Sequence, residues 1–433
     1  MKKDLCVFAL LTAFIFAFWY RAMLNFFAQD DFILINQFSQ NNLLQDIQNV
    51  FGFPQVTHWR PIHNLYFFVT GNIFGKNYFG YHILTFLFHI GASFLVYKTA
   101  SKLTNSSKAG FVAGFIYAIH PAHFISLFWI SGGTTLIGFF FLAASFYSHL
   151  LGKRSVSLIL YVLALLASEA MIVGLIIFAV YEFLFKREKI DKLFLTIAGI
   201  ISVIFLIIRF DFFTSKTTFN VYQIELSTKT ISAVKYYLLR IAGFAEVSGD
   251  QLTSLILLGW LALIALLLIK TLNKERGIRQ LILSITIIII GLFPFILIPK
   301  HLSPHYMNIS IFGFSILVGV ALINIKSITR IILLSIFLII TLFNINLTQK
   351  NNWVIKRSNL AKIYIDQIKK VNPPQEATLV FTDNKLSTSK EAYIALGTGY
   401  AIKFFFSNKN YQTCFSEFED CLTNNANIYV IGD

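Results

Sequence analysis

Residues 5–31 read LCVFALLTAFIFAFWYRAMLNFFAQDD, an apolar run that ends shortly before two adjacent carboxylates. The run from Leu5 to Leu24 is about as long as a helix needs to be to cross a bilayer. Asp30 and Asp31 follow where the chain leaves the membrane, and an acid pair facing lipid there would be costly. The pair therefore favours a cavity that opens to water at the membrane edge.

The composition is that of a polytopic membrane protein. Of the 433 residues, 56% are hydrophobic and 13% are charged, and the mean hydropathy is +0.68. The charged share is about half that of a soluble protein. The first run is too long for a signal peptide, and no small-x-small cleavage site precedes Asp30, so we expect a retained helix. The net charge of +15 does not indicate nucleic-acid binding, because Lys and Arg gather in short loops between apolar runs.

About eleven apolar runs approach the length of a spanning helix. They are residues 5–24, 81–100, 109–128, 131–150, 156–168, 170–185, 193–210, 251–269, 280–298, 305–323 and 329–347. The fifth and sixth runs are short and meet at Ser168-Glu169, as either a tight hairpin or one broken helix. Residues 232–246 are apolar enough for a twelfth span or a re-entrant segment.

Basic residues precede the first run and follow the second, fourth, sixth, eighth and tenth runs. Examples are Lys2, Lys102, Arg154, Arg187, Arg276 and Arg330. The positive-inside rule then predicts a multi-pass protein of the plasma or inner membrane with a cytoplasmic N-terminus. The regions expected outside are the first loop (25–80), Ser168-Glu169, residues 211–250, residues 299–306 and the tail.

The tail is more polar than the rest of the chain. We expect a transmembrane domain over 1–350 and a small extracytoplasmic α/β domain over 351–433. Residues 353–370 have the pattern of an amphipathic helix, and residues 377–381 and 427–431 have the pattern of strands. Cys414 and Cys421 form either a disulfide or a loose thiol pair.

Several polar residues are candidates for chemistry at the outer face. A carboxylate in a partly desolvated pocket suits a general base, and two neighbouring carboxylates can raise the pKa of one of them. The alternative for Asp30 and Asp31 is a helix N-cap or a solvated loop charge. In the sequence His58-Trp59-Arg60-Pro61, His58 and Arg60 are candidates for binding phosphate, because Arg60 offers a planar fork of donors for phosphate oxygens. Trp59 fits an aromatic belt.

Three further groups have both a functional and a structural interpretation. Glu169 lies in apolar sequence, as a functional acid or as a structural hydrogen-bonding group. His305-Tyr306 opens a late span and can contact a lipid phosphate, while the nearby Lys300 fits interfacial snorkelling. His120 and His123 can face one way on a helix, but no third ligand stands at a fixed spacing, so a divalent metal is not supported.

The order of these motifs resembles that of the membrane-embedded GT-C glycosyltransferases, most closely the protein O-mannosyltransferase and dolichyl-phosphate-mannose mannosyltransferase-like group. The resemblance is clearest over residues 25–185 and continues more weakly to His305-Tyr306. The residues that carry it are Asp30-Asp31-Phe32, Trp59-Arg60-Pro61, Phe74-Gly75, Gly80-Tyr81-His82, His89 and Ile119-His120-Pro121. Many relatives have Asp-Glu in place of Asp30-Asp31 and Lys-Glu in place of Ser168-Glu169. The tail beyond residue 350 has no specific match.

The resemblance implies an outer cavity roofed by the first loop and a polyprenyl-phosphate sugar donor that enters from the bilayer. Asp30 or Asp31 would deprotonate an acceptor hydroxyl on a protein, lipid or glycan. That oxygen would attack C1 of a mannose-like sugar with inversion, while Arg60 and His305 stabilise the departing phosphate. The sequence establishes no cofactor, and a divalent metal is possible but not supported.

Two other functions fit a chain with many spans. A transporter or flippase would also need polar groups near the membrane, but such proteins often carry inverted repeats, and the sequence shows none. A noncatalytic scaffold would not require Asp, Arg, Glu and His to gather on one face. A cavity that joins the acid pair to Arg60 favours the transferase, whereas a path through the membrane favours transport.

Overall fold

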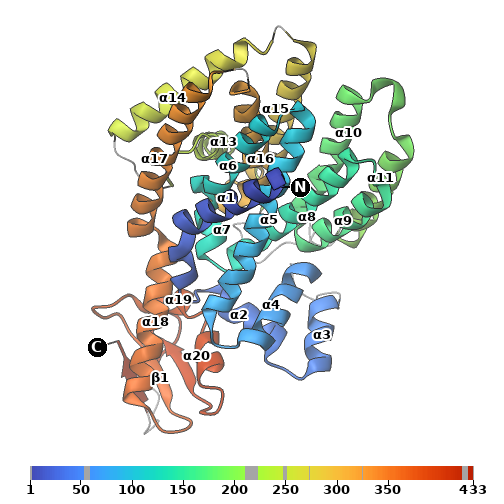
Figure 1. Ribbon diagram of the computed structural model, residues 1–433. Coiled ribbons are helices and arrows are strands. Elements are labelled where there is room, and N and C mark those ends of the chain that lie inside the picture. Colours follow the sequence, from blue (N-terminus) through green and yellow to red (C-terminus); the bar gives the residue numbers. More distant parts are fainter. Residues whose placement is uncertain are drawn as a thin grey trace.

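Helices make up most of the computed structural model, which describes residues 2–52, 59–209, 223–246, 251–272, 274–323, 325–421 and 428–432. Figure 1 shows the long helices gathered in one bundle, with the C-terminal α/β elements at one end beside α2. The predicted class, a helical membrane protein with a small α/β unit near its C-terminus, is confirmed.

Each of the eleven apolar runs forms a helix or a bent helix pair, but α9, α10 and α11 are shorter than a spanning helix. Within the described residues, seven helices are long and apolar enough to cross a membrane, or eight if the bent pair Ser107–Ile119 and Pro121–Phe128 is one span. The helices are α1 (Lys2–Trp19), α5 (Tyr78–Thr104), α6 (Ser107–Ile119) with α7 (Phe124–Phe128), α8 (Thr134–Leu150), α9 (Arg154–Ala167), α10 (Gly174–Phe185), α11 (Lys192–Ile208), α14 (Gln251–Ile269), α15 (Glu275–Ile296), α16 (Asn308–Ala321) and α17 (Ser327–Asn351).

Two breaks interrupt these helices. Pro121 cannot donate a backbone hydrogen bond, and the chain bends by 44° between α6 and the segment that starts there. Between α9 and α10 the backbone is extended at Ser168 and then forms the 3-10 helix η4 (Glu169–Val173). The rings of Tyr161 and Phe178 meet at 5.5 Å, so α9 and α10 lie side by side as a hairpin.

Helix α16 lies at the centre of the bundle. Of the 18 residues Pro304–Ala321, which end with α16, 89% are buried inside the protein. Two glycines allow the close approach, because a Cβ at Gly313 would lie 2.7 Å from the Ser284 carbonyl oxygen and one at Gly319 would lie 2.7 Å from the Ala109 carbonyl oxygen. Small residues at such contacts let backbones pack closely within a membrane.

The first loop is folded into helices where the structure describes it. Helices α2 (Asp30–Ser39), α3 (Leu43–Phe51) and α4 (Pro61–Phe74) pack on one another beside the bundle. Residues 232–246, the candidate twelfth span or re-entrant segment, overlap α13 (Thr228–Ile241), which is not among the helices long and apolar enough to cross a membrane.

The C-terminal unit, residues 353–432, begins one residue after α17. Its helix α18 (Trp353–Val371) is followed by β1 (Thr378–Phe381), α19 (Ser389–Ala395), α20 (Tyr400–Phe405), β2 (Gln412–Phe415) and β3 (Ile428–Ile431). The strands form a parallel sheet in the order β2-β1-β3, with Val380 opposite both Cys414 and Val430. Cys414 and Cys421 form a disulfide, which settles the alternative left open by the sequence.

Candidate active site at the acid turn

Asp30 and Asp31 lie in a tight turn that starts helix α2. The amide of Asp31 donates to the carbonyl of Ala28 at 3.1 Å, which closes a four-residue turn. Gln29 has φ 53° and ψ −120°, the geometry of the first central residue in a type II′ turn, a position that glycine normally occupies. Such a backbone costs on the order of 1–3 kcal/mol and persists only where its surroundings enforce it. We call residues 28–31 the acid turn.

Asp31 is a buried member of the acid turn. Its side chain is 1% exposed and accepts hydrogen bonds from the amide of Ala28 at 2.9 Å and from the amide and hydroxyl of Ser131 at 2.8 and 2.5 Å. Burial raises the pKa of its carboxyl to about 7, although these hydrogen bonds oppose the change. Its acceptor sites are therefore occupied by the protein itself.

Asp30 is the accessible member of the acid turn. Its side chain is exposed, yet protein atoms crowd around it closely enough for desolvation to raise the pKa of its carboxyl, while the charge of Arg357 acts in the opposite direction. A side chain that water reaches and that protein nonetheless surrounds lies in a recess. Asp30 thus has the access that a base toward an outside acceptor needs.

Arg60 and Glu169 form the charged group predicted from the first loop and the α9–α10 break. Arg60 Nε donates to Glu169 Oε2 at 2.8 Å, and its Nη2 donates to Oε1, a two-pronged pair with both side chains about one-fifth exposed. Arg209, at the end of α11 and 3% exposed, lies within electrostatic reach of both. Two guanidinium groups beside one carboxylate leave an excess positive charge suited to an anion.

His305 and Tyr306 lie in the 3-10 helix η7 (Pro304–Met307), which leads into α16. His305 Nδ1 lies 2.6 Å from the Ser303 hydroxyl, and its ring is within electrostatic reach of Arg60. Tyr306 stacks on Phe295 with ring centroids 4.3 Å apart. The structure thus brings His305 near Arg60, whereas Tyr306 packs against the ring of Phe295.

The segment 129–135 connects the acid turn to His305. Trp129 Nε1 donates to the Ala28 carbonyl at 3.2 Å, and its ring lies edge-on to that of His305 with centroids 6.0 Å apart. Ser131 holds Asp31, and Thr135 donates from its hydroxyl to the His305 carbonyl. Trp129 and the 3-10 helix η3 (Ser131–Gly133) therefore fix the acid turn and η7 relative to each other.

Sequence reasoning missed three residues of this region. Ser131 and Arg357 carried no motif, and Arg209 was counted among the residues of an apolar span. The signal for Arg209 was available, since an ionisable residue at the end of an apolar run is a functional candidate. His58, which was predicted to bind phosphate, lies outside the described residues.

The histidine pair His120 and His123 serves packing in the bundle. His120 Nε2 lies 3.0 Å from the carbonyl oxygen of Ile241, and His123 meets the ring of His89 at 4.6 Å. Among the residues that the structure describes, no group of three His, Cys, Asp or Glu side chains is placed to hold a metal ion.

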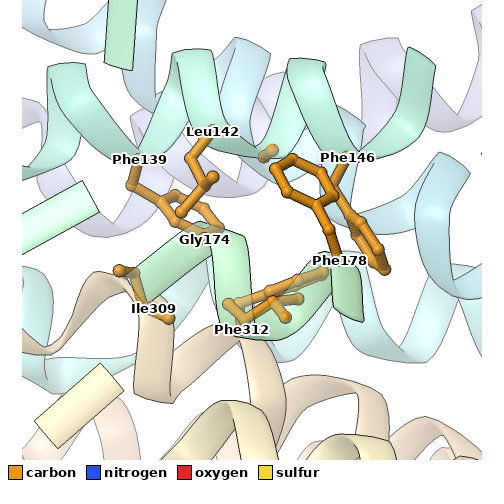
Figure 2. Close-up of a pocket in the computed structure, with 9 residues that line it drawn as sticks. Phe139, Leu142, Phe146, Gly174, Phe178, Ile309 and Phe312 are labelled. Atoms are coloured by element: carbon orange, nitrogen blue, oxygen red, sulfur yellow. The ribbon is translucent and has the colours of Figure 1, made fainter. Parts of the chain in front are cut away.

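An apolar cavity lies between α8, α10 and α16, away from the acid turn. Figure 2 shows Leu142 and Phe146 of α8 facing Gly174 and Phe178 of α10, with Phe312 of α16 closing the far side. Its void of about 250 Å³ includes the space at its open side, and all nine lining residues are apolar. The room within it for the centre of a water-sized sphere is about 10 Å³, close to the least that one water molecule needs. It offers none of the groups that the transfer chemistry needs.

Comparison with solved structures shows the same fold in two membrane proteins. The chain aligns over 94% of its length with 89% of ArnT from Cupriavidus metallidurans, solved with undecaprenyl phosphate, at a TM-score of 0.57 and 12% identity. It also aligns over 94% of its length with 64% of the oligosaccharyltransferase AglB from Archaeoglobus fulgidus, solved with an inhibitory peptide and a dolichol-phosphate, at a TM-score of 0.54 and 11% identity. The predicted GT-C fold is thereby confirmed.

Comparison of sequences gives a shorter match. The chain is 30% identical over 143 residues to the Protein O-mannosyl-transferase Tmtc1 of Drosophila melanogaster, which covers 31% of this chain. The chain spans 17% of the length of that relative. No protein-family model matches the chain.

Proposed function

We propose that this integral membrane protein is a glycosyltransferase that moves a mannose-like sugar from a polyprenyl-phosphate donor to an acceptor hydroxyl. The observation that carries the proposal is the pairing of an accessible, recessed carboxylate, Asp30, with the positive group of Arg60 and Arg209 on a GT-C fold. The solved relatives support the donor class, because ArnT holds undecaprenyl phosphate and AglB holds a dolichol-phosphate.

In the proposed reaction Asp30 is the base. Its carboxylate takes the proton of the acceptor hydroxyl, the acceptor oxygen forms a bond to the sugar C1, and the C1–O bond to phosphate breaks on the opposite face. The electron pair of that bond leaves on the phosphate oxygen, so the configuration at C1 is inverted. Asp31 does not serve as the base, because its oxygens are held by Ala28 and Ser131.

The leaving phosphate would be bound by the positive group. Arg60 has the donor fork for phosphate oxygens, Arg209 adds a second positive charge, and Glu169 orients Arg60 through the two-pronged pair. Contacts with the Ser303 hydroxyl and the Trp129 ring hold His305 in place, and from there its ring would complete the phosphate site. Tyr306 would position η7 by its stacking on Phe295.

The acceptor would be a protein, lipid or glycan on the outer side of the membrane. The basic loops support a cytoplasmic N-terminus, which places the acid turn and the C-terminal unit outside. The disulfide between Cys414 and Cys421 agrees with that side, because disulfides persist in oxidising compartments.

The test is a transfer assay with purified protein in lipid nanodiscs. Polyprenyl-phosphate hexoses and pentoses are offered with hydroxyl acceptors, and the release of polyprenyl phosphate is measured. Asp30→Asn keeps the shape of the side chain but removes the base, so we expect transfer to fall by roughly 100-fold or more. The matched control is Asp366→Asn, since Asp366 is exposed on α18 and pairs with Lys369.

Equal activity in Asp30→Asn and in the unaltered protein would contradict the proposed base. No turnover of any donor in the panel, together with uptake of a labelled lipid-linked sugar into vesicles, would favour the transporter or flippase instead.

A further inference from the structure

The C-terminal unit makes direct contacts with the acid turn. The amide of Gln29 donates to the Ala395 carbonyl at 3.1 Å, and Arg357 Nη1 donates to Gln29 Oε1 at 2.6 Å. The Ser358 hydroxyl donates to the Phe26 carbonyl at 2.9 Å, just before the turn. These contacts join residues more than 300 positions apart, and the first two meet at Gln29, the residue that precedes Asp30.

Arg357 is itself held in place on α18. Its Nε and Nη2 donate to the two carboxylate oxygens of Glu391 at 3.0 and 3.2 Å, and its guanidinium lies 5.3 Å from the centre of the Trp353 ring. Trp353 in turn meets Trp129 with ring centroids 5.3 Å apart, and Trp129 binds the Ala28 carbonyl. Because Glu391 holds the guanidinium of Arg357 by two hydrogen bonds, the remaining donor Nη1 points in one fixed direction, toward Gln29.

The strain at Gln29 shows why such support is needed. A non-glycine residue at φ 53° relaxes to negative φ unless its neighbours prevent this, and relaxation here would turn the following residue, Asp30, away from its present direction. Gly397 closes the turn from the other side, because even a Cβ there would lie 2.5 Å from the Gln29 carbonyl oxygen. The carbonyl and amide of Gln29 are thus both enclosed by the C-terminal unit.

We propose that Arg357, clamped by Glu391, is a positioning residue for transfer, and that the C-terminal unit completes the active site by holding Gln29 and aiming Asp30. The inference rests on the proposed function for its catalytic readout, but the support of the turn is measurable without it. The charged groups that face Asp30 are Arg357 from α18 and its neighbour Asp31, while Glu391 from α19 is paired with Arg357.

The first measurement is hydrogen exchange followed by mass spectrometry of peptides covering residues 26–36. We expect Arg357→Gln and Glu391→Gln to speed exchange in these peptides, because the contacts that hold Gln29 are lost or loosened. Lys362→Gln is the matched control, since Lys362 is exposed on the same helix. Unchanged exchange in both Arg357→Gln and Glu391→Gln would overturn the inference, whatever the activity of the protein.

The second measurement is the pH profile of transfer. In Arg357→Gln we expect kcat to fall on the order of 100-fold, as small misplacements of a reacting group do, with little change in KM for the donor. The acid limb of the pH–rate profile should also move to higher pH. The positive charge of Arg357, which lowers the pKa of the Asp30 carboxyl, is absent in this variant. Arg357→Lys keeps that charge and should restore the limb while kcat stays low.

The outcomes separate the two proposals. An active wild type with kcat and acid limb unchanged in Arg357→Gln overturns the positioning role alone. A wild type without transfer activity contradicts the proposed function, while the exchange measurement still decides whether Arg357 supports the turn.

Discussion

Asp30 and Asp31 are adjacent in the chain and have opposite surroundings. Asp31 points into the protein and meets three donors, while Asp30 lies in a recess beside Arg357. The turn separates them, because consecutive side chains at the start of a helix point in different directions. One acid therefore fixes the turn, and the other is left exposed for the role of base that we propose.

The buried acid gives a pH-dependent stability. The folded pKa of Asp31, about 7, lies above its ordinary value of 3.8, so between these values the folded protein holds a proton that the unfolded chain has lost. The contribution of this group to stability is then fully present below about pH 4 and is lost as pH rises through about 7. In Asp31→Asn we expect the melting temperature, relative to wild type, to increase from pH 4 to 7.

Parallel melting curves of the two proteins across that range would contradict the assignment of a raised pKa to Asp31. The comparison is made as a difference because other groups titrate in both proteins.

At the scale of single residues, sequence pattern identified the members of the site with recognisable chemistry. Arg60 and Glu169 were both singled out, and the structure pairs them. Arg357 was not, because its role depends on a contact with Gln29 across 328 positions of sequence and on a turn with positive φ. Neither the contact nor the turn leaves a periodic or compositional trace.

At the scale of elements, the connection between α19 and α20 bears on the acid turn. It carries two glycines with positive φ, Gly397 and Gly399. Gly397 has φ +56° and lies against the Gln29 carbonyl, whereas Gly152, at the end of α8, has φ +75° with nothing within 4 Å of an added Cβ. Both glycines have positive φ, but an added Cβ would meet the Gln29 carbonyl oxygen only at Gly397.

This difference supplies a paired test. Gly152→Ala should cost roughly 1 kcal/mol of stability from backbone strain alone and leave transfer unchanged. Gly397→Ala carries the same strain and also pushes on the Gln29 carbonyl, so we expect a larger loss of thermal stability and at least tenfold slower transfer. Equal effects of the two substitutions on transfer would count against the contact at Gln29.

Element prediction succeeded where hydropathy alone decides the outcome. Apolar runs located the bundle helices, and short runs of β-branched and aromatic residues located β1 and β3. The strand β2 (Gln412–Phe415) was missed because four residues that include Gln and Thr give too short a pattern. No secondary structure was predicted for the loop 25–80, and its helices α2 and α4 are stabilised by packing that a linear pattern does not reveal.

At the scale of the whole molecule, charge predicts orientation. Counted span by span, the basic loops are predicted on one side of the membrane and the acid turn on the other. The sequence therefore predicts that residue 274 faces the cytoplasm and residue 408 faces outward. With Cys6→Ser as background, Asn408→Cys should react with an impermeant maleimide in intact cells, and Lys274→Cys only after permeabilisation. Both positions are exposed. The reverse pattern would contradict the topology.

The overall architecture was predictable because the bilayer imposes length and polarity on every span. The packing of the C-terminal unit on the first loop was not, since it depends on contacts such as the stacking of Phe26 on Phe405 at 5.6 Å between distant parts of the chain. Long-range contacts of this kind are set by shape complementarity in three dimensions.

The separation between Gln29 and Arg357 also has a consequence for biosynthesis. Ribosomes add the acid turn near the beginning of translation and its partner 328 positions later. A growing chain inserted in the membrane would therefore carry the carboxylates long before it carries the groups that aim them. By the proposed positioning role, a chain terminated before residue 353 would lack the groups that hold Gln29 and aim Asp30.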